Sequence, residues 1–275
     1  MWIKLLLAAM FVLMLSTAVI VQPLRQRSLL GARGQGGPNL KLMSWNIGYG
    51  DLETETRARA EDLPAVAQII LANDPDAVAL QELTGEGQLQ LLLKHLKNRY
   101  RGQVCSFGSA DRVAAVLVRD RTVHFNDVPA GERFAAAATF RLSKELPEIV
   151  FISAHADAFS SARRRTFAGD VVDWARGRDE GQIAFIAGDL NFEVSIRNKT
   201  NLFTDDAKND SESYGYLSKY FRDLGREAGE TSINDRRIDY VFGPPETVTL
   251  RRAEVLRGTA IGRMDHWPLL VEVGV

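Results

Sequence analysis

Short apolar runs along the chain end directly on polar or ionisable residues, and no other feature of the sequence constrains the fold as strongly. The polar residues that come just past the end of such a run are Asn46, Glu82, His155, Asp189 and Asn191. A further acidic residue, Asp239, lies inside the apolar run 238–242. Burying a carboxylate or an imidazole costs free energy unless the group is paired or bound to a metal. Strands that deliver such groups at their ends are therefore expected to share one polar site.

Each of these residues also has an ordinary structural interpretation. Asn46 could close a turn, and the segment 188–191 could form a turn or cap a helix. The pair Asp265-His266 could belong to a surface loop before Pro268. Taken one at a time, these interpretations are favoured. A shared site explains all of them at once, and we prefer it for that reason.

Helical patterns alternate with the apolar runs. Residues 57–73 carry apolar residues at helical spacing before Asn73-Asp74-Pro75, and 167–175 is a second predicted helix. The predicted strands are 40–45, 77–80, 113–118, 149–153, 183–187, 238–242 and 268–273. This alternation predicts the α/β or α+β class, with helices covering the sheet.

The first residues of the chain have the pattern of a targeting segment. A basic start at Lys4 is followed by the uncharged run 5–21, whose length lies between those of a signal-peptide core and a membrane-spanning helix. We expect residues 1–22 to be a signal peptide or transmembrane anchor, with an uncleaved anchor slightly favoured. Residues 23–39 are predicted to be a flexible, Gly-rich tether and 40–275 the folded domain. The domain would then be membrane-anchored or exported, on the periplasmic or extracellular side.

Charge and cysteine content narrow the range of partners. The chain has 34 Lys plus Arg against 35 Asp plus Glu, which gives a net charge of −1. A protein that neutralises a long phosphate backbone is usually clearly basic, so any contact with nucleic acid must come from a local patch. The single cysteine excludes an intrachain disulfide. No obligate protein partner is evident from the sequence.

The polar residues fall within motifs that resemble those of a known superfamily. In chain order these motifs are Met43-Ser44-Trp45-Asn46-Ile47, Leu80-Gln81-Glu82, Ser153-Ala154-His155, Gly188-Asp189-Leu190-Asn191, Ile238-Asp239-Tyr240 and Asp265-His266-Trp267-Pro268. Their order resembles that of the endonuclease/exonuclease/phosphatase superfamily, and the match covers residues 40–275. Pancreatic-type deoxyribonucleases, abasic-site endonucleases, neutral sphingomyelinases and inositol-polyphosphate phosphatases belong to it. The resemblance implies a four-layer sandwich of two mixed β-sheets packed face to face, with flanking helices.

The resemblance also implies a metal site. Glu82 would be the primary ligand of Mg²⁺, with Mn²⁺ as the alternative ion. Asn46 would position the metal or a phosphate, and Asp265 would add a ligand. Oxygen ligands are those that a hard cation such as Mg²⁺ prefers, and one or two carboxylates suffice to hold it.

Catalytic roles follow from the same resemblance. Asp189 would orient or deprotonate the attacking water, and Asn191 would donate to a phosphoryl oxygen. His266, oriented by Asp239, would be a charged or proton-transferring partner of the scissile phosphate. His155 would make a second phosphate contact or protonate the leaving oxygen. Either His266 or Asp189 could be the general base.

Arginines and one polar stretch complete the set of candidate residues. The run 163–165 is interpreted either as a solvated helix start or as a contact for phosphate or a lipid headgroup. Arg165, and Arg237 beside Asp239, are the predicted substrate-binding residues. The polar stretch 192–213 is predicted to be a surface loop over the site. Met264 departs from the family pattern, which often has Ser or Thr before the Asp-His pair.

The predicted function is a divalent-metal-dependent phosphoesterase that hydrolyses a phosphodiester or phosphomonoester by in-line attack of water. A nuclease and a lipid or small-molecule phosphatase both fit this prediction. The alternative is a catalytically silent binding module on the same fold. A silent module would be expected to lack Glu82, Asp189 or His266, and all of these are present.

Overall fold

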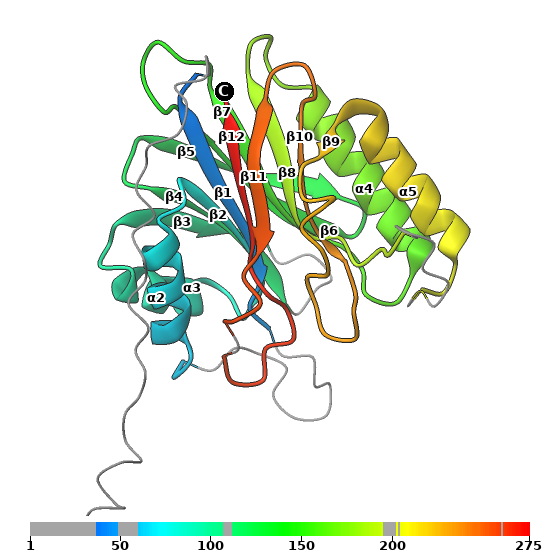
Figure 1. Cartoon of the computed structure of the whole chain (residues 1–275), viewed down its shortest axis with the longest axis horizontal. Coiled ribbons are helices and arrows are strands. Elements are labelled where there is room, and N and C mark those ends of the chain that lie inside the picture. The colour runs from blue at the N-terminus through cyan, green and yellow to red at the C-terminus, as the bar shows by residue number, and fades with distance from the viewer. Residues whose placement is uncertain (1–36, 49–59, 107–111, 195–201, 203, 260) are drawn as a thin grey trace, which may run out of the picture. The chain divides into compact units, whose positions relative to one another are not determined.

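The chain folds around two six-stranded β-sheets (Figure 1). The computed structural model describes residues 37–48, 60–106, 112–194, 202, 204–259 and 261–275. In spatial order the first sheet contains β11 (Thr249–Val255), β12 (Leu269–Gly274), β1 (Asn39–Asn46), β2 (Ala77–Leu83), β4 (Val113–Arg119) and β3 (Tyr100–Val104). The second contains β5 (Val123–Ala130), β6 (Arg133–Phe140), β7 (Ile149–His155), β8 (Ile183–Asp189), β10 (Asp239–Gly243) and β9 (Arg222–Asp223). Both sheets are mixed, because β1–β2 and β7–β8 are parallel pairs and the others antiparallel.

Helices cover the sheets on their outer sides. Helices α2 (Leu63–Asn73) and α3 (Glu86–His95) pack with the first sheet, and α4 (Ser161–Arg176) and α5 (Ala207–Tyr220) lie beside the second (Figure 1). Strand β2 packs against β7, and β4 against β6, so the two sheets lie face to face. The predicted four-layer sandwich is confirmed.

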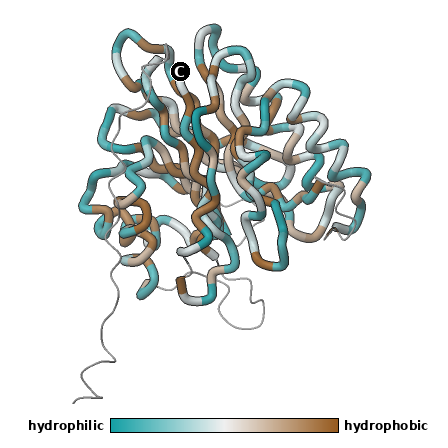
Figure 2. Tube along the Cα trace, in the orientation of Figure 1, coloured by the Kyte–Doolittle hydropathy of each residue, from teal (hydrophilic) through white to brown (hydrophobic). Residues whose placement is uncertain are grey.

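The central strands have apolar, buried side chains on both faces of each sheet. Successive side chains of a strand point to opposite faces. Accordingly, Phe151 of β7 lies in the core between the sheets, whereas Ile152 lies in the core beneath α4. Figure 2 shows the resulting concentration of apolar residues along the central strands. The continuous apolar runs of the sequence are therefore strands that are buried on both sides.

Most predicted elements are present with shifted ends. The predicted helix 57–73 is observed as α2 from Leu63, with Pro64 in its first turn, and residues 49–59 lie outside the described part. The predicted helix 167–175 is longer and begins at Ser161 as α4. The predicted strands are observed within two residues of their expected ends, except that β2 continues three residues further, to Leu83.

The prediction of a surface loop over 192–213 is wrong in its second half. Helix α5 begins at Ala207, after Asp206 accepts hydrogen bonds from the backbone N–H groups of Lys208 and Asn209. An aspartate at this position satisfies donors that have no partner within the helix. Acidic residues that suggested a solvated loop thus initiate a helix. Residues 195–201 and 203 lie outside the described part.

The arginine run of α4 is divided between different environments. Arg164 is fully buried between α4 and α5, where its Nε lies 2.8 Å from Oδ1 of Asp210 and its Nη2 3.1 Å from Oδ2. Asp210 is also fully buried. Neither interpretation of the run, a solvated helix start or a phosphate contact, holds for Arg164. It joins the two helices instead.

The predicted leader lies outside the described residues. Residues 1–22, the predicted signal peptide or anchor, and most of the predicted tether 23–39 are not described. The described part of the tether ends at β1, which begins at Asn39. Among the helices of the described residues, none has the length and apolar character needed to cross a membrane.

Replacing Arg164 with Met is expected to lower the free energy of unfolding by about 3–5 kcal/mol, because Asp210 would keep a buried charge without its partner. Urea unfolding followed by circular dichroism measures this difference. The matched control is Arg165→Met on the same helix, whose exposed ion pair with Glu212 is worth at most about 1 kcal/mol. Equal losses in the two variants would contradict the structural role of Arg164.

Candidate active site

Strand register places three site residues in one row across the second sheet. His155 of β7 is opposite Asp189 of β8, and Asp189 is opposite Asp239 of β10. A shift of one residue would turn each side chain to the other face of the sheet. Gly188 helps to fix this register, since its φ is +145° and a Cβ there would overlap the carbonyl oxygen of Ala154. The alignment of His155, Asp189 and Asp239 therefore depends also on Gly188, the residue directly before Asp189.

Glu82 reaches the site from the first sheet through a β-bulge. Leu80 pairs with Ala115 and Leu83 with Val113, so three steps along β2 match two along β4. Glu82 lies in this irregularity with a φ of +63°, an uncommon conformation for a residue with a side chain. Bulges next to active sites re-aim a side chain, and backbone strain concentrates at such sites. The bulge thus turns Glu82 toward the polar row.

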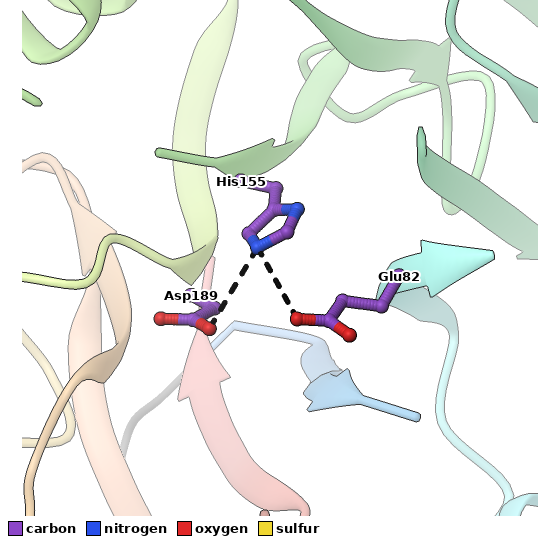
Figure 3. A group of neighbouring side chains, drawn as sticks. All are labelled: Glu82, His155 and Asp189. Atoms are coloured by element: carbon purple, nitrogen blue, oxygen red, sulfur yellow. Dashed lines mark ion pairs between the residues drawn. The ribbon is translucent and has the colours of Figure 1, made fainter. Parts of the chain in front are cut away.

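The carboxylate of Asp189 lies at the centre of the site. Its Oδ2 accepts a hydrogen bond from Nδ2 of Asn46 at 3.0 Å. The same oxygen lies 3.9 Å from Nε2 of His155 and 3.8 Å from Nε2 of His266. Nε2 of His155 is also 3.7 Å from Oε1 of Glu82, and Figure 3 shows the imidazole pointing toward both carboxylates. The two sheets therefore supply facing groups to one cluster.

His266 is held from behind by Asp239. Nδ1 of His266 lies 2.8 Å from Oδ2 of Asp239, and both side chains are buried. The indole Nε1 of Trp45 donates to the backbone carbonyl of His266 at 3.2 Å, which fixes this loop to β1. The hydroxyl oxygen of Thr231 accepts from the backbone N–H groups of Ile238 and Asp239. These contacts leave Nε2 of His266 facing Asp189.

Asp265 completes the cluster beside His266. Its Oδ1 lies 3.9 Å from Nε2 of His266, and its negative charge acts on Glu82. Its backbone carbonyl accepts hydrogen bonds from the hydroxyl of Ser232 and the N–H of Ile233. The structure thus brings together all three predicted metal ligands, Asn46, Glu82 and Asp265, with the predicted catalytic residues.

Asn191 lies next to Asp189 in a left-handed conformation, with a φ of +52°. Its backbone N–H donates to Oδ1 of Asp189 at 3.0 Å, and its Nδ2 donates to the carbonyl of Ala156 at 3.2 Å. An amide nitrogen has two N–H donors. One of them is used by Ala156, and the second is the donor that the predicted phosphoryl contact would need.

The charged groups shift one another's pKa values in different directions. Burial raises the pKa of Asp189, although the charge of His266 opposes this. Burial likewise raises the pKa of Glu82 against the charge of Arg112, which forms an ion pair with it. Burial alone would lower the pKa of His266, but the charges of Asp239 and Asp189 outweigh it and raise the pKa to about 10. His266 is therefore a cation near neutral pH.

The pKa of His155 shifts downward, in the direction opposite to that of His266. Burial lowers its pKa to about 3, and the positive charges of Arg133 and Arg112 act in the same direction. The imidazole of His155 is therefore neutral near pH 7 and has one N–H to donate. Two histidines in one site thus take different protonation states, which suits them to different roles.

The donor set fits a hard divalent cation. Oxygen and nitrogen atoms of Glu82, His155 and Asp189 lie within 4.8 Å of one another. Atoms of Asp189, Asp239 and His266 lie equally close, but a cationic His266 has no free nitrogen lone pair for a metal. The raised pKa values of Glu82 and Asp189 indicate that nearby positive charge does not compensate their burial. A divalent cation would supply that charge and prefers carboxylate and amide oxygens. Glu82 could bind such a cation, and Asn46, which hydrogen-bonds Glu82, and Asp265, whose charge acts on Glu82, are near enough to contribute.

The structure does not bring Arg165 or Arg237 into this cluster. Arg165 contacts Glu212 and Asn209 of α5. Nη2 of Arg237 lies 2.7 Å from both carboxylate oxygens of Asp223, and its guanidinium lies 4.4 Å from the ring centre of Tyr240. Arg237 is buried in this arrangement. These contacts engage Nη2, whereas Nε and Nη1 have no hydrogen-bond partner among the described residues.

Two arginines next to the site were not identified from the sequence. Arg112 pairs with Glu82, and Arg133 lies near enough to His155 to affect its pKa. Neither residue follows a strand end or belongs to one of the recognised motifs. Arg133 begins β6, an element that the apolar runs did not predict. Their charge was the only signal in the sequence, and many exposed residues of the chain are charged as well.

Comparisons with known proteins agree with this fold. The sequence profile of the Endonuclease/Exonuclease/phosphatase family matches residues 43–262. A solved protein of that description from Bacteroides thetaiotaomicron is 19% identical, with a TM-score of 0.67 over 87% of this chain and 98% of that chain. A mannosyl-6-phosphatase from the same species is 19% identical, with a TM-score of 0.65 over 86% and 100%. The human Nocturnin catalytic domain with bound sulfate is 18% identical, with a TM-score of 0.64 over 86% and 95%. No curated protein matches the chain.

Replacing Asp239 with Asn is expected to lower the pKa of His266 from about 10. The substitution removes the nearest negative charge, while burial continues to disfavour the cation. In the metal-free protein, nitrogen NMR of the imidazole should show His266 protonated at pH 7 and losing its proton only near pH 10. In the variant the transition should move to lower pH. An unchanged transition would contradict the pairing of Asp239 with His266.

Proposed function

Since the chain belongs to the endonuclease/exonuclease/phosphatase family, we propose that it is a phosphoric ester hydrolase that depends on a divalent metal ion, with Mg²⁺ as the expected ion. Members of this family are nucleases and phosphatases. The observation that carries the proposal is the position of Asp189. Its Oδ2 faces Asn46, His155 and His266 at 3.0–3.9 Å, so one carboxylate is shared by both sheets.

The proposed chemistry assigns a separate task to each group. A bound cation would neutralise charge on the phosphoryl oxygens, and Glu82, Asn46 and Asp265 would hold it. Asp189 would accept a hydrogen bond from the attacking water and orient it. His266, kept cationic by Asp239, would stabilise the negative charge that develops on the phosphoryl group. Neutral His155 would donate its N–H to the substrate or the leaving oxygen.

The substrate is proposed only by class. A nuclease and a lipid or small-molecule phosphatase both use in-line attack on a phosphate ester. The net charge of −1 favours a short or small substrate over a long phosphate backbone. The fold likeness to a mannosyl-6-phosphatase is compatible with a phosphomonoester, although 19% identity supports the shared fold alone. A silent binding module is disfavoured, because every predicted catalytic and metal-binding side chain lies in one cluster.

The proposed location of the enzyme depends on residues 1–22. If they form a signal peptide or anchor, the catalytic domain would act in the periplasm or outside the cell. That assignment is a prediction from the sequence pattern of those residues.

Metal removal is expected to abolish hydrolysis, and Mg²⁺ or Mn²⁺ is expected to restore it. Binding should also raise the melting temperature, because a ligand that binds only the folded state stabilises it by about 2.7 kcal/mol at a hundredfold excess over its Kd. In Glu82→Gln this increase should require at least about tenfold more metal. The control Glu86→Gln removes an exposed carboxylate of α3. Full activity of the metal-stripped protein would contradict the proposal.

Replacing His266 with Ala is expected to lower turnover by about 10²-fold or more, the usual scale for a lost electrostatic or acid–base group. Asp239→Asn should act in the same direction. The double variant should lose less than the product of the two single effects, because the side chains act as one unit. The control is His124→Ala, at an exposed position of β5.

The assay for these variants is a panel of substrates. It contains a chromogenic phosphodiester, a phosphomonoester, single- and double-stranded DNA, sphingomyelin and a phosphoinositide. A substrate that the wild type hydrolyses and His266→Ala does not would identify the activity. Equal hydrolysis of every substrate by both proteins would contradict the role of His266.

A further inference from the structure

Arg112 has a place in the active site that the proposed function does not explain. It lies directly before β4, and its Nη1 donates to Oε2 of Glu82. The two side chains are 15% and 14% exposed, so solvent screens this ion pair little. The charge of Arg112 also acts on His155, which places the guanidinium beside the catalytic residues. A cation that binds Glu82 must therefore share the carboxylate with Arg112 or displace it.

The two carboxylate oxygens of Glu82 face different parts of the site. Oε1 lies 3.7 Å from Nε2 of His155, and Figure 3 shows the other oxygen pointing away from that imidazole. Oε2 lies against the end of β1, where a Cβ on Gly48 would overlap it. The backbone N–H of Gly48 donates to Oδ1 of Asn46 at 2.9 Å. Arg112 thus occupies the oxygen of Glu82 that lies on the side of Asn46.

A cation held by both Glu82 and Asn46 would bind to this same oxygen. The cation and the guanidinium of Arg112 would then lie next to each other, and like charges repel at such a distance. The repulsion is stronger in a buried site, because the local dielectric constant is lower than that of water. Arg112 is therefore expected to leave Oε2 when a cation binds there.

Arg112 would need a new anionic partner after leaving Glu82. Within the described residues, Glu82 is the ion-pair partner that is observed for it. The other carboxylates of the cluster each have a nitrogen of His266 within 3.9 Å, and they are Asp189, Asp239 and Asp265. A phosphoryl group that binds the cation brings new negative charge to the place that Arg112 faces. Guanidinium groups bind phosphoryl oxygens through paired, charge-assisted hydrogen bonds.

We propose that Arg112 changes partner when the site is loaded: it pairs with Glu82 in the metal-free protein and with a phosphoryl oxygen of the substrate once a cation occupies Glu82. This inference rests on the proposed function for the cation and for the phosphate ester. Arg112 is then a substrate-binding residue that also lowers the affinity for the cation alone. The cation and the phosphoryl group bind cooperatively, because each favours the state in which Arg112 has left Glu82.

The first test measures Mn²⁺ binding without catalysis, by electron paramagnetic resonance of the free ion. Arg112→Gln is expected to bind Mn²⁺ about tenfold or more tightly than the wild type, the scale of one charge-assisted hydrogen bond, because nothing competes for Oε2. The control is Arg133→Gln, which removes a charge that also acts on His155 but pairs with Asp157. Its affinity for Mn²⁺ should change much less. Equal changes in the two variants would overturn the proposal, since the loss of any nearby positive charge would then have the same effect.

The second test measures the coupling between cation and anion. Sulfate takes the place of the phosphoryl group, and Mn²⁺ titrations with and without sulfate give the factor by which the anion raises the affinity for Mn²⁺. This factor should be about tenfold or more larger in the wild type than in Arg112→Gln, where only the direct attraction between the two ions remains. Equal factors in the two proteins would overturn the change of partner.

A third measurement uses the wild type alone and does not depend on the folding of a variant. The Nε signal of Arg112, assigned through its own backbone in the nitrogen NMR spectrum, should shift when Mg²⁺ is added and shift again when sulfate follows. A signal that stays unchanged through both additions, while other signals of the site report Mg²⁺ binding, would overturn the proposal.

The outcomes distinguish this inference from the proposed function. A protein that hydrolyses phosphate esters with Mg²⁺ but shows none of these differences would have the proposed function, and the change of partner would be overturned. Competition and coupling through Arg112 in a protein that hydrolyses no phosphate ester would support the change of partner and contradict the proposed function.

Discussion

The buried carboxylate of Asp189 is the constraint on which the arrangement of both sheets depends. Its burial raises its pKa, so the site must supply compensating donors and positive charge. Asn46 from the first sheet and His266 from the last connection meet this need, and a cation would meet it further. Because these groups come from different sheets, the sheets must pack with one relative position. The energetic cost of one polar group thus links strand register, sheet packing and chemistry.

The sequence predicts the part of the fold that is buried on both sides. Strands such as β7 and β8 read as apolar runs because helices cover one face and the second sheet covers the other. Strands at or near the sheet edges, such as β5 and β11, alternate between exposed and partly buried residues, and this weaker pattern was not recognised. Helix α5 was missed because its polar residues resemble those of a loop. The start of α5 is determined by a local contact, the cap at Asp206. Its position is determined by a contact between residues far apart in the sequence, Asp210 and Arg164.

The site residues could be predicted because each follows the end of a strand or lies in a motif next to one. Their exact partners depend on geometry that no short motif encodes. The β-bulge at Glu82 depends on a mismatch with β4, and the contact of Arg237 with Asp223 depends on how two loops meet. A charged residue near a motif can therefore face the site or stabilise a loop beside it. Sequence alone does not distinguish these outcomes, because both place the same residue at the same position in the chain.

The arginine run of α4 shows how adjacent residues of one short segment can take different structural roles. Successive residues of a helix are rotated by about 100°, so adjacent side chains face different surroundings. Arg163 contacts Asp157 just past the end of β7, Arg164 is buried against Asp210, and Arg165 pairs with Glu212 on the exposed side. The buried contact fixes α4 against α5 and so positions the arginine before it next to the active site. Loss of Arg164 should therefore disturb the packing of α4 on α5, whereas loss of Arg163 should disturb only its contact with Asp157.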